Sequence, residues 1–433
     1  MRRTTWILTL VAATALVASA CTADDDTPAG DATTETGEPA TLDFWVFHEI
    51  AGGGFYTRLV SEFEAAHPNI DVEVTAFPEE NYDVKIDTAV AAGQAPDLIL
   101  IFGPDYPRQG LVLPIDDVIA EKGIDLSSFS PAIVGEGGEY SCGWEGKLYC
   151  LGSYLGISAL VYSKDMFDAA GIQHPAPWPP MTPDRFVEIA CQLSDPTNDV
   201  WGGGAADPMA FIPWEALVSS DARTAVGYVN GPTVVHSFDI LAQGFAQDCF
   251  PSLNVLDPWI QGRDFLAQGQ LGMAITDYLA LDTVEAAGVD WGTTAPPTPS
   301  GYDPHIYTWS DAVAVMSITE HPDEAKEFVA FVGTEGQRIR FETTGDIPLD
   351  SKAAEEVDWA AGVPGREEGL EVAAHTRATI FIPDRWNVFG PLWDAWGFVV
   401  AGDQTAQDAL DEVAPAIQEN LDQAWEAWEE QAT

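Results

Sequence analysis

The stretch TLDFWVFHEIAGGGFYTRLVSEFEAAHPNIDVEVTAF (residues 41–77) decides the fold, because it holds a complete strand–helix–strand unit. Residues 42–47 are apolar and β-prone, and three glycines then interrupt the strand. Large apolar side chains recur at helical spacing over 55–63, until the His-Pro pair at 67–68 stops the helix. Residues 70–77 alternate as a second strand. Strands that alternate with helices predict an α/β protein with mostly parallel sheets covered on both faces.

The same rhythm continues along the chain. We expect further strands at residues 96–102, 155–162, 273–276 and 312–316. We expect further helices at 84–92, 164–171, 182–193 and 322–332, and a helical tail at 406–428 that is broken near Pro415. About 390 residues remain after the N-terminal 40 are set aside, which exceeds what one hydrophobic core usually supports and predicts two lobes.

The N-terminal residues 1–21 have the form of an export signal. Two arginines precede a short apolar run that ends in small residues, and the run is too short to cross about 30 Å of hydrocarbon comfortably. The end of this segment, VASAC (17–21), resembles a bacterial lipobox, in which Cys21 becomes lipidated and starts the mature protein. The alternative is an ordinary cleaved signal with an incidental cysteine. Residues 22–40 have too little apolar surface to fold, and we expect a disordered tether.

The charge is strongly acidic. With 18 Lys and Arg against 69 Asp and Glu, the formal net charge is −51, which makes binding to nucleic acid or to an anionic membrane surface improbable. The acidity indicates either a cationic ligand or a surface adapted to high salt, where screening removes the self-repulsion. We favour the surface adaptation, because the acidic residues are scattered along the whole chain.

Five cysteines fit an oxidising compartment, since lipidation of Cys21 leaves an even four. Cys142 and Cys150 flank a short segment with a Glu-Gly turn, so we expect a disulfide across a hairpin. Cys191 and Cys249 then pair by elimination. Free buried thiols are the alternative. A zinc site is disfavoured because the chain has no CxxC motif, and we expect no metal.

An ordered series of motifs gives the chain a family resemblance from residue 41 to the C-terminus. The segments that carry it are FEAAHPNIDV (63–72), AGQAPD (92–97), GKLY (146–149), LVYSKDMF (160–167), FLAQGQLGMA (265–274) and HPDEAKEF (321–328). The series resembles the extracellular solute-binding proteins of ABC importers, specifically the large carbohydrate-binding family related to maltose-binding protein.

The resemblance implies a periplasmic-binding-protein-like fold, with two α/β lobes hinged across a ligand cleft. The first lobe would hold residues 41–152 and 310–350, and the second would hold 153–308 and 351–433. It also implies a monomer that works with permease subunits, touches the membrane only through its lipid anchor on the extracellular face, and needs no cofactor. A ligand trapped between two hinged lobes shifts the balance between their open and closed states.

Candidate ligand contacts lie at loops that follow strands or accompany the lobe crossings. Sugars offer hydroxyls and apolar ring faces, so their sites combine carboxylates, amides and arginine with aromatic platforms. The candidates are Trp45, His48, Glu49, Asp105, Tyr154, Asp277, Tyr278, Trp309, Asp311, Arg385, Trp386 and Asn387. Trp45 lies inside an apolar run and is favoured as a core residue, while His48 and Glu49 are as well explained as a solvated loop pair.

The sequence therefore predicts a lipid-anchored subunit of an ABC importer that captures a mono- or oligosaccharide without a chemical step. Two alternatives stay open. The same fold could bind a cationic solute such as a polyamine, which the acidity motivates. The chain could also be an exported glycoside hydrolase or esterase, although it has no Gly-x-Ser-x-Gly motif and a pair of carboxylates proves nothing at this charge.

Overall fold

The computed structural model describes residues 39–47, 54–136, 138, 140–255, 261–277, 281–304 and 306–430. The expected signal, Cys21 and nearly all of the tether lie outside these ranges, as do His48, Glu49 and Tyr278. Within the described part of the chain, no helix combines the length and the apolar character that crossing a membrane requires.

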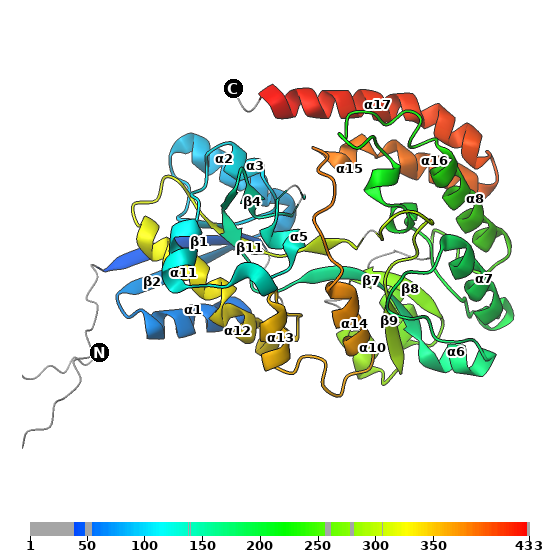
Figure 1. The fold of residues 1–433 in the computed structure, drawn as a ribbon, viewed down its shortest axis with the longest axis horizontal. Coiled ribbons are helices and arrows are strands. Elements are labelled where there is room, and N and C mark those ends of the chain that lie inside the picture. Colours follow the sequence, from blue (N-terminus) through cyan, green and yellow to red (C-terminus); the bar gives the residue numbers. More distant parts are fainter. Residues whose placement is uncertain are drawn as a thin grey trace, which may run out of the picture. The chain divides into compact units, whose positions relative to one another are not determined.

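The first lobe is built on a mixed five-stranded sheet (Figure 1). Its strands follow the order β2 (Ile70–Phe77), β1 (Ala40–Phe47), β3 (Leu98–Ile101), β11 (Ala312–Val315) and β6 (Cys150–Leu151). In β1, the alternate side chains of Leu42, Phe44 and Val46 are fully buried. A slip of one residue would turn all three toward the other face, so burial fixes the register.

Helices cover this sheet. They are α1 (Phe55–Ala66), α2 (Tyr82–Ala92), α3 (Asp105–Arg108), α4 (Asp116–Lys122), α5 (Pro131–Val134), α11 (Pro322–Gly333) and α12 (Glu335–Thr344). The next helix, α13 (Ser351–Glu356), begins the segment expected in the second lobe, but Ser351 donates to the carbonyl oxygen of Ser128 in the first lobe at 3.0 Å. Phe44 of β1 and Phe63 of α1 both meet the ring of Phe328 in α11 edge-on, at centroid distances of 5.4 and 5.0 Å. These aromatic contacts fix α1 and α11 against the sheet.

The second lobe is organised around β7 (Gly156–Ser163), whose eight residues are all buried. It pairs with β10 (Thr308–Trp309), β8 (Met273–Asp277) and β9 (Trp291–Thr294). Along β7, Ile157, Ala159 and Val161 join a hydrophobic cluster that continues from the first lobe. Leu160 and Tyr162 point into a separate cluster of the second lobe. The period of two along one strand therefore divides its side chains between two cores.

The helices of the second lobe are α6 (Lys164–Ala170), α7 (Pro183–Leu193), α8 (Pro232–Ala246), α9 (Gln261–Ala267), α10 (Asp282–Ala286), α14 (Arg366–Ala373), α15 (Arg385–Val388), α16 (Pro391–Ala401) and α17 (Ala406–Glu430). The expected break at Pro415 is wrong, because α17 runs through it. Pro415 lies on the exposed side, while Ala414 and Ile417 are buried on either side of it and hold the helix against its lobe.

The expected two-lobe α/β architecture is confirmed, but the expectation of mostly parallel sheets is wrong. β1 is parallel to β2 and β3, whereas β11 is antiparallel to both of its neighbours. Every pairing of β7 is antiparallel. Alternation of helices and strands predicts parallel neighbours only where consecutive strands share a sheet. Here the chain leaves the first sheet after β6 and returns to it at β11, so β11 enters from the opposite end.

Three chain segments lie side by side where the chain passes between the sheets. The Ser310 hydroxyl donates to the carbonyl oxygen of Tyr154 at 2.7 Å, and the Leu155 N–H donates to the carbonyl oxygen of Ile347 at 2.8 Å. A Cβ on Gly152 would lie 1.9 Å from the Ser310 hydroxyl oxygen. Only a glycine at 152 allows the segment around Gly152 and the segment around Ser310 to approach so closely.

The first disulfide closes a hairpin. The strands β4 (Gly143–Trp144) and β5 (Lys147–Leu148) pair antiparallel. Glu145 and Gly146 form the turn between them, with φ of 49° and 76°. Positive φ at both central residues is the geometry of a tight hairpin turn. The Cys142–Cys150 disulfide spans this hairpin with a Cα–Cα distance of 5.1 Å, as the sequence predicted.

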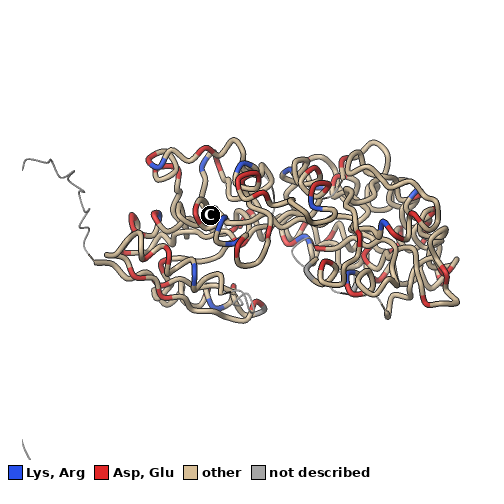
Figure 2. The backbone as a smooth tube through the Cα atoms, turned by 90° about the horizontal axis from the view of Figure 1, so that it is seen from below, with Lys and Arg blue, Asp and Glu red and all other residues tan. Residues whose placement is uncertain are grey.

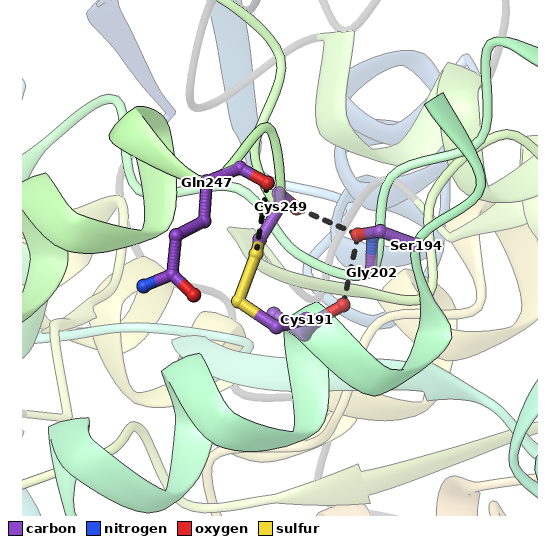
Figure 3. The surroundings of a disulfide bond; sticks show 6 residues. Cys191, Ser194, Gly202, Gln247 and Cys249 are labelled. Atoms are coloured by element: carbon purple, nitrogen blue, oxygen red, sulfur yellow. Dashed lines mark hydrogen bonds between the residues drawn. A yellow bond between two sulfur atoms is a disulfide. The ribbon is translucent and has the colours of Figure 1, made fainter. Parts of the chain in front are cut away.

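The second disulfide, Cys191–Cys249, joins the end of α7 to the segment after α8 (Figure 3). The Ser194 hydroxyl lies 3.1 Å from the Cys249 carbonyl oxygen and accepts a 2.7 Å hydrogen bond from the Gly202 N–H. The disulfide and the Ser194 hydroxyl thus join α7 to the segment after α8. Both predicted disulfides are present.

Acidic residues are spread over both lobes, with few Lys and Arg among them (Figure 2). The spread agrees with the scattering of acidic residues along the sequence, and the surface adaptation stays a prediction.

Candidate ligand-binding groove

Four polar side chains meet where the chain passes between the lobes, and we call Tyr154, Asp311, Arg340 and Asp346 the crossing network. The Tyr154 hydroxyl donates to Asp311 Oδ1 at 2.8 Å. Arg340 Nε lies 2.5 Å from Asp346 Oδ2, and the Arg340 guanidinium lies 4.1 Å from the centroid of the Tyr154 ring. The Arg340 side chain is only 5% exposed. Tyr154 and Asp311, both candidate ligand contacts, are thus engaged inside the protein.

The pKa shifts in the crossing network match this burial. Burial alone would lower the pKa of Arg340, but Asp346 and the other acidic groups nearby raise it above its usual value. Burial, followed by the Asp311 carboxylate, raises the pKa of Tyr154 well above its usual value. From these two pKa shifts it follows that Arg340 stays charged and Tyr154 stays neutral over the physiological pH range.

An aromatic cluster surrounds Arg385, the first residue of α15. The guanidinium carbon lies 4.8 Å from the Trp214 ring centroid, 4.9 Å from Tyr307, 5.2 Å from Trp386 and 5.8 Å from Tyr140. Arg385 also donates to the Tyr307 hydroxyl. Burial lowers the pKa of Arg385 to about 9. Arg385 therefore organises the four rings, while Trp386 is 44% exposed and available for contact.

Hydroxyl groups and a buried carboxyl extend this cluster. The hydroxyls of Tyr140 and Tyr307 lie 3.1 Å apart, and burial first, then Tyr140 and Asp207, raises the pKa of Tyr307. Asp207 accepts a 2.8 Å hydrogen bond from the Met209 N–H, and burial raises its pKa to about 6. A carboxyl with such a shift beside neutral hydroxyls is typical of functional sites, although structural networks produce similar shifts.

A groove of about 590 Å³ lies next to the cluster, with α3 of the first lobe on one side and α15 and α17 of the second lobe on the other. Its walls combine two carboxylates, three amides and one indole with smaller apolar side chains. They are Asp105, Pro383, Asp384, Asn387, Val388, Asn420, Gln423, Ala424, Ala427 and Trp428. This volume fits a small organic ligand, and the wall chemistry fits a ligand rich in hydroxyls.

The two carboxylates of the groove influence each other. Burial first raises the pKa of Asp105, Arg108 lowers it, and Asp83 and Asp384 raise it again. Asp384 has a left-handed backbone with φ of 47°, and it accepts a 2.7 Å hydrogen bond from the Asn387 side chain. Asp384 and Asn387 thus hold each other in place at the wall, and a hydroxyl-bearing ligand could bond to both.

Three further candidates that the structure describes, Trp45, Trp309 and Asp277, are not among the residues that line the groove. Trp45 donates to Asp43 at 3.0 Å and packs 4.8 Å from the Phe77 ring, within the first core. Trp309 lies 6.0 Å from Tyr307 at the edge of the aromatic cluster. Asp277 ends β8. Of the twelve candidates, the structure brings Asp105, Arg385, Trp386 and Asn387 together around the groove and the cluster.

Several groove residues were missed by the sequence reasoning. Trp428, Asn420 and Gln423 belong to a tail whose spacing indicates only a helix, and nothing in the sequence links residue 428 to residue 105. Tyr307 was within reach of sequence reasoning, because it lies two residues from the candidate Trp309. In the described ranges, no cluster of three or more potential metal ligands occurs.

Comparison with known proteins gives the family. A family model described as bacterial extracellular solute-binding protein matches residues 48–339. A maltotriose-binding protein of Pyrococcus abyssi is 24% identical over 298 residues, which cover 66% of this chain and 60% of that protein.

Solved structures show the same fold. The sugar-binding protein MalE of Xanthomonas citri has a TM-score of 0.75 at 17% identity and covers 90% of this chain and 99% of its own. An ABC substrate-binding protein of Listeria monocytogenes, in complex with cycloalternan, has a TM-score of 0.69 at 20% identity. The match covers 88% of this chain and 99% of that protein. Since the family model spans well over half of the residues, the chain belongs to the bacterial extracellular solute-binding protein family.

Proposed function

We propose that the protein is the solute-binding subunit of an ABC importer and captures a mono- or oligosaccharide without altering it. The observation that carries this proposal is the groove beside the aromatic cluster. Its carboxylates and amides suit sugar hydroxyls, and the exposed face of Trp386 suits the apolar face of a sugar ring. Closure of the lobes around the ligand would be the signal that permease subunits sense.

The names of similar proteins support the same ligand class. Maltotriose is the ligand in the name of the Pyrococcus relative, and the Xanthomonas structure is described as sugar-binding. The carbohydrate is the proposed ligand here because the groove offers matching chemistry.

We further propose that the protein works as a monomer on the extracellular face of the cell membrane, held by a lipid on Cys21. The acidic composition supports an attachment through the lipid alone, since a net charge of −51 repels an anionic membrane surface. Radiolabelled fatty acid should enter the wild-type protein and not Cys21→Ser, and labelling of both would reject this anchor.

A thermal-shift screen tests the ligand class. We expect glucose, maltose or maltotriose to raise the melting temperature, since a ligand at 100 times its Kd stabilises the native state by about 2.7 kcal/mol. Calorimetry then gives the affinity of Asn387→Ala, which should be weaker than wild type. Asn198→Ala is the matched control, because Asn198 also donates to an aspartate three residues earlier, Asp195, at 2.6 Å. Equal affinity of both variants would remove Asn387 from the site.

The acidic walls of the groove favour one second candidate, a cationic solute. Asp105 and Asp384 repel each other, and a protonated amine between them would relieve that repulsion. The same screen therefore includes putrescine and spermidine, and a response to these amines without a response to sugars would replace the carbohydrate proposal. Chromatography of sugars after incubation with the protein tests the hydrolase alternative, for which we expect no new product.

A further inference from the structure

One contact joins the lobes beside the groove, far along the chain from the crossings. Arg108 of α3 donates through a terminal nitrogen to the carbonyl oxygen of Trp428 at 2.6 Å. Its guanidinium carbon also lies 3.8 Å from the centroid of the Trp428 ring. Trp144 of the first lobe meets the same ring edge-on at 6.2 Å. Trp428 is thus held by two side chains of the first lobe.

Trp428 itself belongs to the second lobe. Upstream on α17, Ile417 and Leu421 are buried in the second hydrophobic cluster, and α17 packs against α8, α15 and α16. Beyond residue 421, no further residue of α17 is fully buried among those described. Figure 1 shows this end of α17 extending toward α3 and β4. The last turns of α17 therefore keep only partly buried contacts with their own lobe, among them Trp425 and the contact of Trp428 with Phe381 at 4.6 Å, and they also reach the other lobe.

The contact also lies at the groove. Trp428 and Asp105 both line it, and Asp105 and Arg108 are the two ends of α3. We propose that Arg108 and Trp428 form a clamp that holds the two lobes together across the groove and slows the exchange of its ligand. The slower exchange of the ligand rests on the proposed function, whereas the connection between the lobes does not.

The chain provides a matched control for this clamp. Arg223 stacks on Trp425, also on α17, at 3.9 Å from the ring centroid and donates to Glu429 at 2.7 Å. The loop that carries Arg223 is bonded to Gln418 of α17, so this second stack stays within one lobe. Both pairs have the same chemistry, and only the clamp connects the lobes.

Distance measurements between spin labels test the clamp without any ligand. The labels would be placed on Val84→Cys in α2 and Phe398→Cys in α16, which are 66% and 51% exposed, in the full chain with Cys21→Ser. We expect Arg108→Ala and Trp428→Ala to lengthen and broaden the distance distribution. Arg223→Ala should leave it as in wild type. An unchanged distribution in both clamp variants, or an equal change in Arg223→Ala, would overturn the clamp.

Stopped-flow release of maltotriose tests the effect on the ligand. We expect Arg108→Ala and Trp428→Ala to release it about three to ten times faster, in line with the usual strength of a cation–π contact. The release rate of Arg108→Lys should lie between those of wild type and Arg108→Ala, because lysine keeps the charge but loses the flat stacking surface. If the distance between the spin labels changes but the rate of maltotriose release does not, the proposed effect of the clamp on ligand exchange is wrong. If wild type binds neither maltotriose nor any other sugar, the proposed function fails while the labels still decide the clamp.

Discussion

The crossing network and the clamp solve the same task, joining two lobes, with a similar pair of side chains. Each places an arginine over an aromatic ring, Arg340 over Tyr154 at 4.1 Å and Arg108 over Trp428 at 3.8 Å. They differ in what else the arginine contacts. Arg340 is buried and lies between the carboxylates of Asp346 and Asp311, whereas Arg108 is half-buried beside the groove, bonds to a carbonyl oxygen and interacts with the carboxylate of Asp105.

This difference indicates which junction can open. A buried cation between two buried carboxylates is very costly to separate, because each charge would be left without its partner. A half-buried arginine beside a groove loses less, since water can replace the carbonyl oxygen that it bonds to. We therefore expect the crossing network to persist in every state of the protein and the clamp to break and re-form.

The largest effect is expected from removing the arginine of the crossing network. Arg340→Met leaves Asp346 and Asp311 buried without a cation and should lower the free energy of unfolding by about 3–5 kcal/mol. Arg338→Met on the same helix is the control. Arg338 bonds to Glu62 and Glu342 at the surface, and its loss should cost about 1 kcal/mol or less. Urea unfolding measures both, and similar small losses would show that the network is no rigid junction.

A smaller effect, dependent on pH, is expected at Asp207 beside the aromatic cluster. Its pKa of about 6 in the native state exceeds the usual value, so the native state holds the proton more tightly than the unfolded state. The resulting stabilisation is complete below about pH 4 and is lost as the pH rises through 6. Asp207→Asn has no such loss, so its stability relative to wild type should rise by up to about 3 kcal/mol between pH 4 and 7.

Urea unfolding at several pH values gives this difference directly. Asp195→Asn supplies a control of opposite sign, because hydrogen bonds from Thr197 and Asn198 lower the pKa of Asp195. Its stability relative to wild type should fall as the pH rises. If the difference in stability between Asp207→Asn and wild type does not change with pH, the Asp207 carboxyl has an ordinary pKa in the native protein. The aromatic cluster would then be better hydrated than its burial indicates.

The last of the three effects concerns ligand binding at the exposed face of the cluster. Trp386→Ala should weaken sugar binding by about 1–3 kcal/mol, as expected for loss of a stacking platform, and should leave the fold intact. Phe398→Ala removes an exposed aromatic ring from α16 and should leave the affinity unchanged. Calorimetry compares the two variants. Unchanged affinity in Trp386→Ala would assign the indole to packing against Tyr307 and Trp393.

The elements of the fold were predictable wherever one pattern was strong. The strands at 70–77 and 273–277 and the helix at 183–193 lie within two residues of their expected bounds. The direction of the strands was not predictable, because it depends on where the chain crosses between lobes. Pro415 shows the same limit, since packing over the whole length of α17 outweighs the local cost of one proline.

The site was predictable only from segments that already looked like loops. Asp105 and Asn387 follow a strand and a proline, so their positions pointed to a ligand. Tyr154 and Asp311 stood at equally suggestive positions, but three segments converge there and bury them together. Trp428 gave no local signal at all, because its role comes from a contact over 320 residues of sequence.

The Cys142–Cys150 disulfide gives the two junctions a shared dependence on the surroundings. Cys150 lies in β6, just before the first crossing, and the loop that it closes carries Trp144, which contacts Trp428. Under reducing conditions only non-covalent contacts, such as the hydrogen bond from the Tyr149 N–H to the Cys142 carbonyl oxygen at 2.9 Å, would hold this loop, so both junctions should be more mobile until the disulfide forms. Since the disulfide forms in an oxidising compartment, the two lobes would be held firmly together only after export.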